Sequence, residues 1–412
     1  MSRSTEEDID AEQPLPCLPE ELILEILRRL PVESLLKFRC VRKKWNILFR
    51  NPNFIKNNNS SFLLKYDKKL YSLDYDSSAS LSDSDEPPIK KIRYPLKCIT
   101  DDLKILGCCN GLVCSRHCGG VIWNPTTNEY RVIPRSDTLP AGFRSVSFPG
   151  AGYISFEYGF GYDALSQDYK HVRIVGRSSS TQGKSEVDIY SLKSDSWKRI
   201  QLIPYIISNG PSVSAPGVFY NGALHWIAES YSGNRRKVLI ALDVGNEGFQ
   251  EIPQPENLDV ENFGAYRYVE VLHKCLGMLC SSHMDGYEVW MMKDYGVSES
   301  WTKLYKIPTL INVKSVQSVQ YLRKMEYLKN GEILLKIKQH EVSNLAGEEA
   351  LVVYNPKEAA TRILKHSENG FSGVFQVESY VKNLVPLNSG TYVGDKEQEE
   401  KDIWEALAGI MI

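Results

Sequence analysis

The sequence predicts a small domain of three helices followed by a large all-β domain of the propeller type, for which six blades are favoured. Large apolar residues recur at helical spacing between residues 17 and 56. From residue 61 to about residue 390, short β-type runs alternate with turn residues, and a two-hairpin pattern of about fifty residues repeats. Taken by segment, the predicted fold class is therefore α+β.

Composition limits the classes of partner. The chain has 412 residues, of which 42% are hydrophobic and 24% charged, with a formal net charge of −2. This balance gives no reason to expect nucleic acid or an anionic membrane surface as a partner. The first residues lack the basic and apolar regions of a secretory signal, and no apolar run approaches the roughly eighteen residues of a membrane span. We expect no nucleic-acid and no membrane partner, and a location in the cytoplasm, the nucleus or both.

Three polar stretches fall outside the predicted elements. Residues 1–16 are predicted to be a disordered tail, residues 74–88 a mobile acidic loop, and residues 391–412 a C-terminal tail that can form a short helix. The stretch "PPIKKIR" (87–93) has three basic residues. A nuclear signal is the weaker interpretation of these residues, and a loop is the favoured one.

The helical domain is punctuated by proline. Pro19 suits the first turn of a helix, where its missing N–H group costs nothing. Pro31 breaks the apolar periodicity, and a second helix is predicted to begin at Glu33 or Ser34. Pro52 ends a third helix. The apolar stripe of this third helix consists of Val41, Trp45, Leu48 and Phe49.

These helices carry more apolar residues than they can bury against one another. A unit of roughly forty residues is near the lower limit for an independent domain without metals or disulfides. Leu22 and Ile26 lie on one predicted face, whereas Ile23 and Leu27 lie on the face beside it. The surplus needs a cover, which is either the protein's own β domain or a partner protein. The pattern leaves both open.

The stretch "LPEELILEILRRLPVESLLKFRCVRKKWNILFRNPNF", which begins at Leu18, resembles the F-box. Shared features are the Leu-Pro start, Ile-Leu before the Leu-Pro-Val corner, Arg-Cys-Val, and Lys followed by Trp. Arg42 departs from the plant pattern, which usually has a small polar residue there. The resemblance implies docking on a Skp1-like adaptor, and through it on a cullin and a RING protein. Carried over by position, the implied adaptor-binding residues are Leu18, Pro19, Leu22, Ile26, Leu27, Leu30, Pro31, Val32, Leu35, Leu36, Cys40, Val41 and Trp45.

Some of these residues also have to hold the helices together, and the sequence does not sort them. A basic run lies between the apolar positions. We favour a solvated face for this run over an electrostatic aid to docking. It consists of Arg39, Arg42, Lys43, Lys44 and Arg50.

The β region is a repeat. Five segments share the order β run, polar turn, aromatic or apolar residue, β run. Their anchors are Trp123, Tyr190, Leu242, Trp290 and Tyr354, which are spaced by 67, 52, 48 and 64 residues. Asn-Gly pairs lie between β runs at Asn110, Asn221 and Asn330. Asn-Gly favours type I′ turns because both residues tolerate positive φ.

Two β-type stretches remain at the ends of the repeat, "SFLLKYDKKLYSLDY" and "FQVESYVKNLVPL". A blade shared between them closes the ring and removes exposed edges, which gives six blades. Five blades with an irregular sheet, or seven blades, stay open. Over most of 95–385 the sequence resembles the F-box-associated interaction domain of plant F-box proteins. It is similar to the S-locus type and to those that limit immune-receptor levels.

Residues that suggest chemistry have structural explanations. Cys108, Cys109, Cys114, His117 and Cys118 do not have the spacing of a zinc site, so we expect structural thiols here and at Cys275 and Cys280. His225 beside Trp226 is expected to be a satisfied buried histidine. We expect no metal and no cofactor. Carboxylates expected to accept backbone hydrogen bonds at turns are Asp163, Asp188, Asp195 and Asp243.

The two resemblances imply a non-enzymatic substrate-recognition subunit of a Skp1–cullin–F-box ubiquitin ligase, with an unknown protein as its target. A candidate binding loop is the longest insertion in a repeat, with Asp294, Tyr295, Ser298 and Glu299. Two alternatives stay open. In the first, the propeller binds a small molecule or glycan, or acts catalytically as some kelch propellers do. In the second, the protein is an F-box scaffold that binds Skp1 without a cullin.

Overall fold

The structure is a computed structural model of the full chain. It describes residues 18–51, 54, 60–66, 69–74, 89–96, 103–116, 120–136, 153–178, 183–207, 216–231, 236–256, 258, 267–282, 286–307, 319–328, 331–339, 349–358, 360–363 and 376–388. The predicted tails and all but the first residue of the predicted acidic loop lie outside these ranges. Asp74, the exception, ends a strand.

Three helices form the N-terminal domain, as predicted: α1 (Glu20–Arg29), α2 (Val32–Phe38) and α3 (Lys43–Phe49). Pro19 and Pro31 occupy the N-cap positions of α1 and α2. Acidic residues in the first turn of α1 and basic residues in its last turn interact favourably with the helix dipole and so stabilise the helix. Val41 precedes α3, so the predicted third helix began too early.

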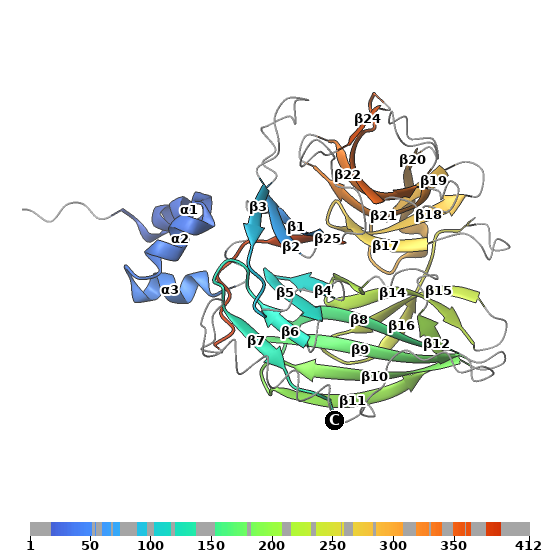
Figure 1. The fold of residues 1–412 in the computed structure, drawn as a ribbon, viewed down its shortest axis with the longest axis horizontal. Helices are drawn as coiled ribbons and strands as arrows, with labels where there is room; N and C mark the ends of the chain where they lie inside the picture. The colour runs from blue at the N-terminus through green and yellow to red at the C-terminus, as the bar shows by residue number, and fades with distance from the viewer. Residues whose placement is uncertain are drawn as a thin grey trace, which may run out of the picture.

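The β domain is a propeller of six described blades (Figure 1). Blade 1 contains β25 (Gln376–Val381), β1 (Ser60–Tyr66), β2 (Lys69–Asp74) and β3 (Ile89–Ile92). Blade 2 contains β4 (Lys104–Cys109), β5 (Leu112–Arg116), β6 (Gly120–Trp123) and β7 (Tyr130–Ile133). Blade 3 contains β8 (Tyr153–Asp163), β9 (Asp168–Ser178), β10 (Gly183–Ser191) and β11 (Ser196–Ile203).

Blades 4 to 6 complete the ring. Blade 4 contains β12 (Tyr205–Ile207), β13 (Val218–Tyr220), β14 (Ala223–Ser230), β15 (Arg236–Asp243) and β16 (Phe249–Ile252). Blade 5 contains β17 (Arg267–Leu272), β18 (Cys275–Ser282), β19 (Gly286–Met292) and β20 (Trp301–Ile307), with the short helix η1 (Ser298–Ser300) before β20. Blade 6 contains β21 (Val319–Tyr327), β22 (Ile333–Gln339), β23 (Glu349–Asn355) and β24 (Ala360–Ile363).

The predicted repeat is confirmed strand by strand. All five anchors lie on the last strand but one of a blade, namely β6, β10, β15, β19 and β23. Asn110 and Gly111 have φ of 47° and 80°, and Asn221 and Gly222 have 47° and 77°, as the predicted turns require. Asn330 lies outside the described residues.

Closure of the ring by both chain ends is also confirmed. β1 pairs with β2 on one side and with β25 on the other, so neither edge of β1 is free. Apolar clusters fill the space between neighbouring blades. One of them joins blade 1 to blade 6 through Phe62, Leu64, Leu334, Leu351 and Val377. Inner strands such as β14 and β15 thus bury both faces, which explains why they are apolar on both faces rather than alternating.

One segment differs from its prediction. The stretch 87–93 was predicted to be a loop, but Ile89–Ile92 forms β3, the outer strand of blade 1. Lys90 and Lys91 are exposed there, which is the pattern of an edge strand protected by charge. Among the described helices, none has the length and apolar character that crossing a membrane requires.

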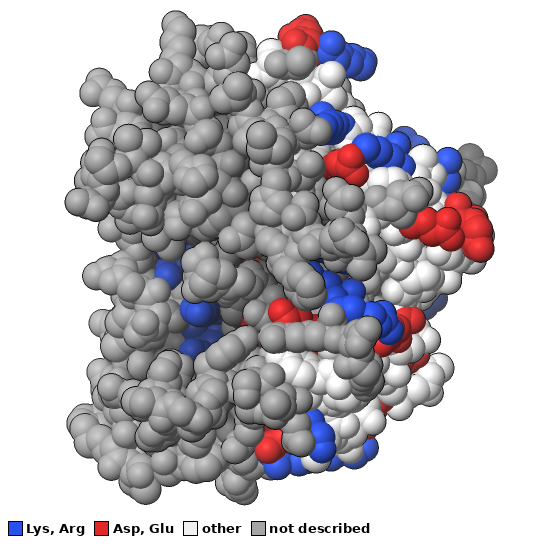
Figure 2. All heavy atoms as spheres, turned by 90° about the vertical axis from the view of Figure 1, so that its right-hand side faces the viewer, with Lys and Arg blue, Asp and Glu red and all other residues white. Residues whose placement is uncertain are grey.

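The helical domain lies at one end of the propeller, next to blade 2 (Figure 1). Residues of α3 and of the β6–β7 turn line one cavity, which places that turn at the same end. Figure 2 shows the face turned away from the helices, where Lys and Arg side chains of described residues are visible inside a hollow.

Candidate functional site

The helical domain concentrates exposed apolar side chains. Five of the eight large apolar side chains that are exposed among the described residues belong to it. The exposed apolar set, as we call these five, is Leu18 (55% exposed), Leu22 (52%), Ile26 (49%), Val41 (67%) and Ile47 (71%). Single exposed apolar residues are ordinary on a protein surface, but several within one short domain mark an interaction site.

The structure sorts the residues implied to bind the adaptor. Leu18, Pro19, Leu22, Ile26, Pro31, Cys40 and Val41 are exposed. Leu30, Leu36 and Trp45 are half-buried, whereas Leu27, Val32 and Leu35 are buried between the helices. Ile47 is also exposed, but it is not among the implied adaptor-binding residues, because the features shared with the F-box end at Trp45.

The helical core has a contribution from the propeller. Leu384, which follows β25, is 4% exposed and belongs to the same cluster as Leu27, Val32, Leu35 and Phe49. The β domain, one of the two covers that the sequence left open, therefore contributes to the helical core. Leu384 fills part of the helical core, whereas the exposed apolar set remains open to solvent.

The basic run is solvent-exposed. Lys44 lies 3.7 Å from Glu20, with both side chains well exposed. Arg39, Arg42, Lys43 and Arg50 are exposed, and the structure gives them no ion pair with any described residue. A solvated face and a docking aid both remain compatible with this arrangement.

The candidate binding loop is the β19–β20 turn, and Tyr295 anchors it. The Tyr295 hydroxyl lies 2.7 Å from His225 Nε2, and the two rings meet edge to face at 5.6 Å. Ser300 Oγ donates to the carbonyl oxygen of Asp294 at 2.8 Å. Asp294 and Glu299 are exposed, and Ser298 is half-buried. Tyr295 therefore holds the loop to blade 4, while the two carboxylates face solvent.

His225 is a satisfied buried histidine, as expected. Its Nδ1 lies 3.1 Å from the carbonyl oxygen of Val218, so Nδ1 donates and Nε2 accepts from Tyr295. Burial lowers the pKa of His225 to about 4. The ring is therefore neutral at pH 7.

The buried thiols have no activated neighbour. Burial raises the pKa of the Cys109 and Cys114 thiols far above the ordinary value. Cys114 Sγ lies 3.5 Å from His171 Nδ1, but burial lowers the pKa of His171 to about 4. A neutral thiol beside a neutral imidazole is not the ion pair that nucleophilic catalysis needs. Within the described ranges no group of metal-ligating residues converges, and His117 and Cys118 lie outside them.

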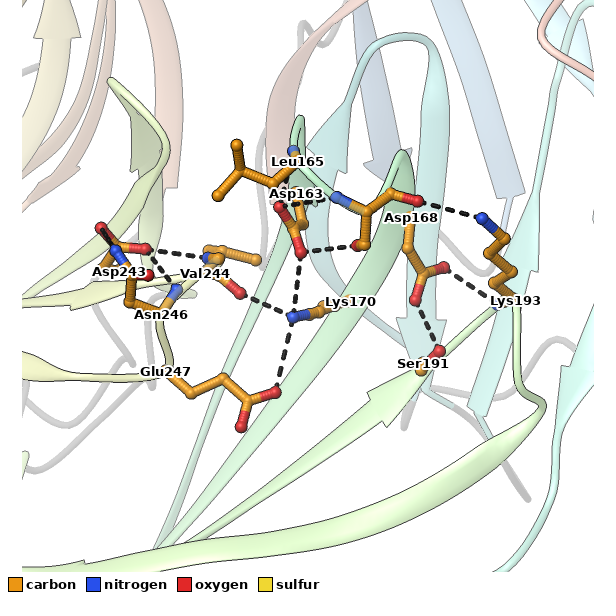
Figure 3. Close-up of polar contacts among 12 residues, drawn as sticks. Asp163, Leu165, Asp168, Lys170, Ser191, Lys193, Asp243, Val244, Asn246 and Glu247 are labelled. Carbon is orange, nitrogen blue, oxygen red and sulfur yellow. Dashed lines mark hydrogen bonds and ion pairs between the residues drawn. The ribbon is translucent and has the colours of Figure 1, made fainter.

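Two predicted turn carboxylates behave as expected (Figure 3). Asp163 accepts hydrogen bonds from the backbone N–H groups of Leu165 and Ser166 at 2.9 and 3.3 Å, and Asp243 accepts from those of Gly245 and Asn246. Burial alone would raise the pKa of Asp163, but bonds from Ser166, Lys170 and the backbone hold the pKa below its ordinary value.

Lys170 joins blades 3 and 4 at this point (Figure 3). Its Nζ lies 3.2 Å from Asp163 Oδ2, 2.8 Å from the carbonyl oxygen of Val244 and 3.5 Å from Glu247 Oε1. Asp168, which sequence reasoning missed, accepts from Ser191 Oγ and from the backbone N–H of Lys193. These partners satisfy the charges, so the cluster is structural rather than a vacant site.

The expectation was wrong for Asp188. It lies within β10, fully buried, and accepts hydrogen bonds from Arg173 Nη2 at 2.7 Å and Arg199 Nε at 2.9 Å. Arg173 also stacks over the Trp197 ring at 4.6 Å. Asp195 is at a turn, where it accepts a hydrogen bond from the Tyr190 hydroxyl.

Three short helices with exposed apolar side chains, joined to a six-bladed propeller, define an F-box protein of the propeller type. The family model for the F-box domain matches residues 15–57, and that for the F-box associated beta propeller domain matches residues 61–387. The chain belongs to this F-box-associated β-propeller family.

Its relatives are F-box proteins of Arabidopsis thaliana. The chain is 29% identical to F-box protein CPR1 over 94% of both chains. It is 28% identical to F-box/kelch-repeat protein At3g23880 over 90% of this chain and 96% of the relative. Among solved structures, the endo-arabinase of Bacteroides thetaiotaomicron covers 61% of this chain and 95% of its own, with 11% identity and a TM-score of 0.31. A similarity that weak carries no argument about function.

Proposed function

We propose that this protein is the substrate-recognition subunit of a Skp1–cullin–F-box ubiquitin ligase. The helical domain docks on a Skp1-like adaptor, which connects it to the cullin and the RING protein, and the propeller holds a protein target. The observation that carries the proposal is the exposed apolar set on a domain whose remaining large apolar residues are buried or half-buried in its own core. The proposed location is the cytoplasm, the nucleus or both.

The proposed mechanism is proximity. A receptor that binds target and adaptor together raises the effective concentration of target lysines near the ubiquitin-loaded enzyme. Such a receptor needs no catalytic residue of its own. The neutral, buried states of Cys114, His171 and His225 are consistent with this role.

The test replaces exposed apolar residues of α1. We expect the double variant Leu22→Asp/Ile26→Asp to lose adaptor binding by about a hundredfold or more, because each side chain contributes roughly 1.5–3 kcal/mol when buried at an interface. Both residues are about half exposed, so the free protein keeps its fold. Leu27 and Leu35 are unsuitable for this purpose, because they are buried and their replacement unfolds the domain.

Leu165→Asp is the matched control, because Leu165 is 83% exposed on a propeller turn. It should bind the adaptor like the parent. Adaptor binding can be measured by calorimetry, and the cullin can be detected after affinity capture under proteasome inhibition. Unchanged adaptor binding by the double variant would refute the proposed docking surface. Capture of the adaptor without a cullin would indicate a scaffold instead of a ligase subunit.

A further inference from the structure

The chain after β25 lies between the two domains. We call residues 382–388 the strap. In Figure 1 the red strap runs along the side of the propeller that faces α3. Its apolar side chains divide between the domains. Leu384 packs into the helical core, whereas Val385 and Leu387 pack into the cluster between blades 2 and 3.

The propeller holds the strap through buried hydrogen bonds. Asn383 is 2% exposed, and its Nδ2 donates to the carbonyl oxygen of Asn110. Asn124 Nδ2 donates to the carbonyl oxygens of Asn383 and Val385 at 3.2 and 2.9 Å. Glu129 Oε2 accepts from the backbone N–H of Leu387 at 2.9 Å. Buried and satisfied polar groups of this kind fix one arrangement of the backbone.

On the helical side of the junction, the strap reaches the helices through Leu384 and Lys382. Leu384 is the strap residue in the helical core, and Lys382 Nζ lies 3.7 Å from Glu33 Oε1. Beside Leu384 the two domains are separated by a cavity of about 350 Å³. The cavity is lined by Arg39, Asn46, Phe49, Arg50, Thr127, Glu129, Leu384, Pro386 and Asn388. Within the described part of the strap, Leu384 is therefore the residue that packs into the helical core.

We propose that the strap is a rigid joint that fixes the orientation of the helical domain on the propeller, with Leu384 as its positioning residue. Asn383 ties the joint to blade 2, and Leu384 ties it to the helices. The orientation does not depend on the proposed function. Its consequence for ubiquitin transfer does, because a fixed joint holds a bound target at a constant place relative to the adaptor.

The test measures the distance between the domains in the full chain. Dyes are attached through unnatural amino acids at Lys37 and Glu358, which are both exposed, and single-molecule energy transfer is recorded. We expect one narrow distribution for the parent. Leu384→Ser and Asn383→Ala should each broaden it, and Leu384→Met should restore it. Leu202→Ser is the matched control, because Leu202 is 63% exposed on β11.

The two variants separate positioning from folding. Asn383→Ala leaves Leu27, Val32, Leu35 and Leu384 in place, so a broader distribution with unchanged helical circular dichroism supports the joint. A narrow distribution in both variants would overturn it. Broadening by Leu384→Ser alone, accompanied by loss of helical signal, would also overturn it, because Leu384 would then be only a core residue.

A second readout uses the reconstituted ligase. The lysines of the propeller that become ubiquitinated can be mapped by mass spectrometry. A restricted set in the parent and a wider set in Asn383→Ala are expected, and the same set in both would contradict the functional consequence. If the parent does not bind the adaptor, the proposed function fails, while the distance measurement still decides whether the joint exists.

Discussion

His171 and His225 each contact a residue of the neighbouring blade, and both are buried. His171 lies beside Cys114 of blade 2, and His225 bonds to Tyr295 of blade 5. Burial lowers both pKa values to about 4. Each histidine is therefore buried as a neutral ring, and its protonation in the folded protein is unfavourable because it places a charge in an apolar environment.

This burial predicts a pH dependence of stability. The unfolded chain takes up protons at these histidines near pH 6.5, whereas the folded chain does so near pH 4. The free energy of unfolding that depends on keeping these histidines neutral is therefore fully present above pH 6.5, and it is lost as the pH falls towards 4. It amounts to about 3 kcal/mol for each histidine. The melting temperature should fall between pH 7 and pH 5.

The control is the variant His171→Gln/His225→Gln, measured over the same range. Its melting temperature should depend less on pH, although it will be lower throughout. The carboxyl of Asp163 does not interfere, because its lowered pKa places its titration below this range. An equal slope in parent and variant would mean that other groups cause the dependence.

For single residues, the sequence predicted burial beside sequence neighbours better than it predicted contacts with residues on other strands. The burial of His225 followed from its place in an apolar strand beside Trp226. The role of Asp188 did not, because Arg173 and Arg199 reach it from adjacent strands. Those arginines are 15 and 11 residues away along the chain. Pairing across strands depends on register, which a single sequence does not specify for a long hairpin.

Hairpins are the elements that the sequence predicted most directly. The Asn-Gly pairs at Asn110 and Asn221 form the expected turns, because few residue pairs accept positive φ at both positions. The equivalent turn of blade 5 uses His273 and Lys274, with φ of 48° and 61°. Neither residue signals a turn, so only the repeat itself located that hairpin.

Two glycines with nearly equal φ provide a matched test at the level of the element. A Cβ atom on Gly111 would lie 2.5 Å from both Asn383 Cγ and the carbonyl oxygen of Val381, whereas one on Gly222 would meet nothing within 4 Å. Gly222→Ala should cost about 1–2 kcal/mol through its positive φ alone. Gly111→Ala should cost roughly a further 1–3 kcal/mol through overlap.

The measurement is the melting temperature of both variants beside the parent. Gly111→Ala should be the less stable of the two, and should also loosen the strap as detected by the distance measurement. Equal melting temperatures would show that Asn383 and the backbone at Val381 move aside without cost.

At the scale of the whole molecule, the propeller is a ring that closes where its first and last blades meet. Val377 of β25 is 3% exposed and packs with residues of blade 1 and blade 6. The sequence predicted the shared blade from the two β stretches left over at its ends. It did not predict the strap, because no local pattern relates Leu384 to helices more than 300 residues earlier.

Closure can be tested with Val377→Asp. The change places a carboxylate in the seam between blades 1 and 6. It should lower the free energy of unfolding by several kcal/mol. The melting temperature should fall by about 2 °C or more for each kcal/mol lost. Small-angle scattering should show a larger radius of gyration, because the ring opens. Val297→Asp is the control, since Val297 is 44% exposed. Equal behaviour of the two variants would mean that closure does not depend on this seam.

The long stretch of sequence between the helices and β25 with Leu384 has a consequence for synthesis. The helices leave the ribosome more than 300 residues before Leu384, which completes their core, and before β25, the strand that closes the ring. A chain that stops early lacks both. Translation therefore has to pass Leu384 before the helical domain is packed and oriented, and products terminated before β25 carry an incomplete helical core on an open propeller.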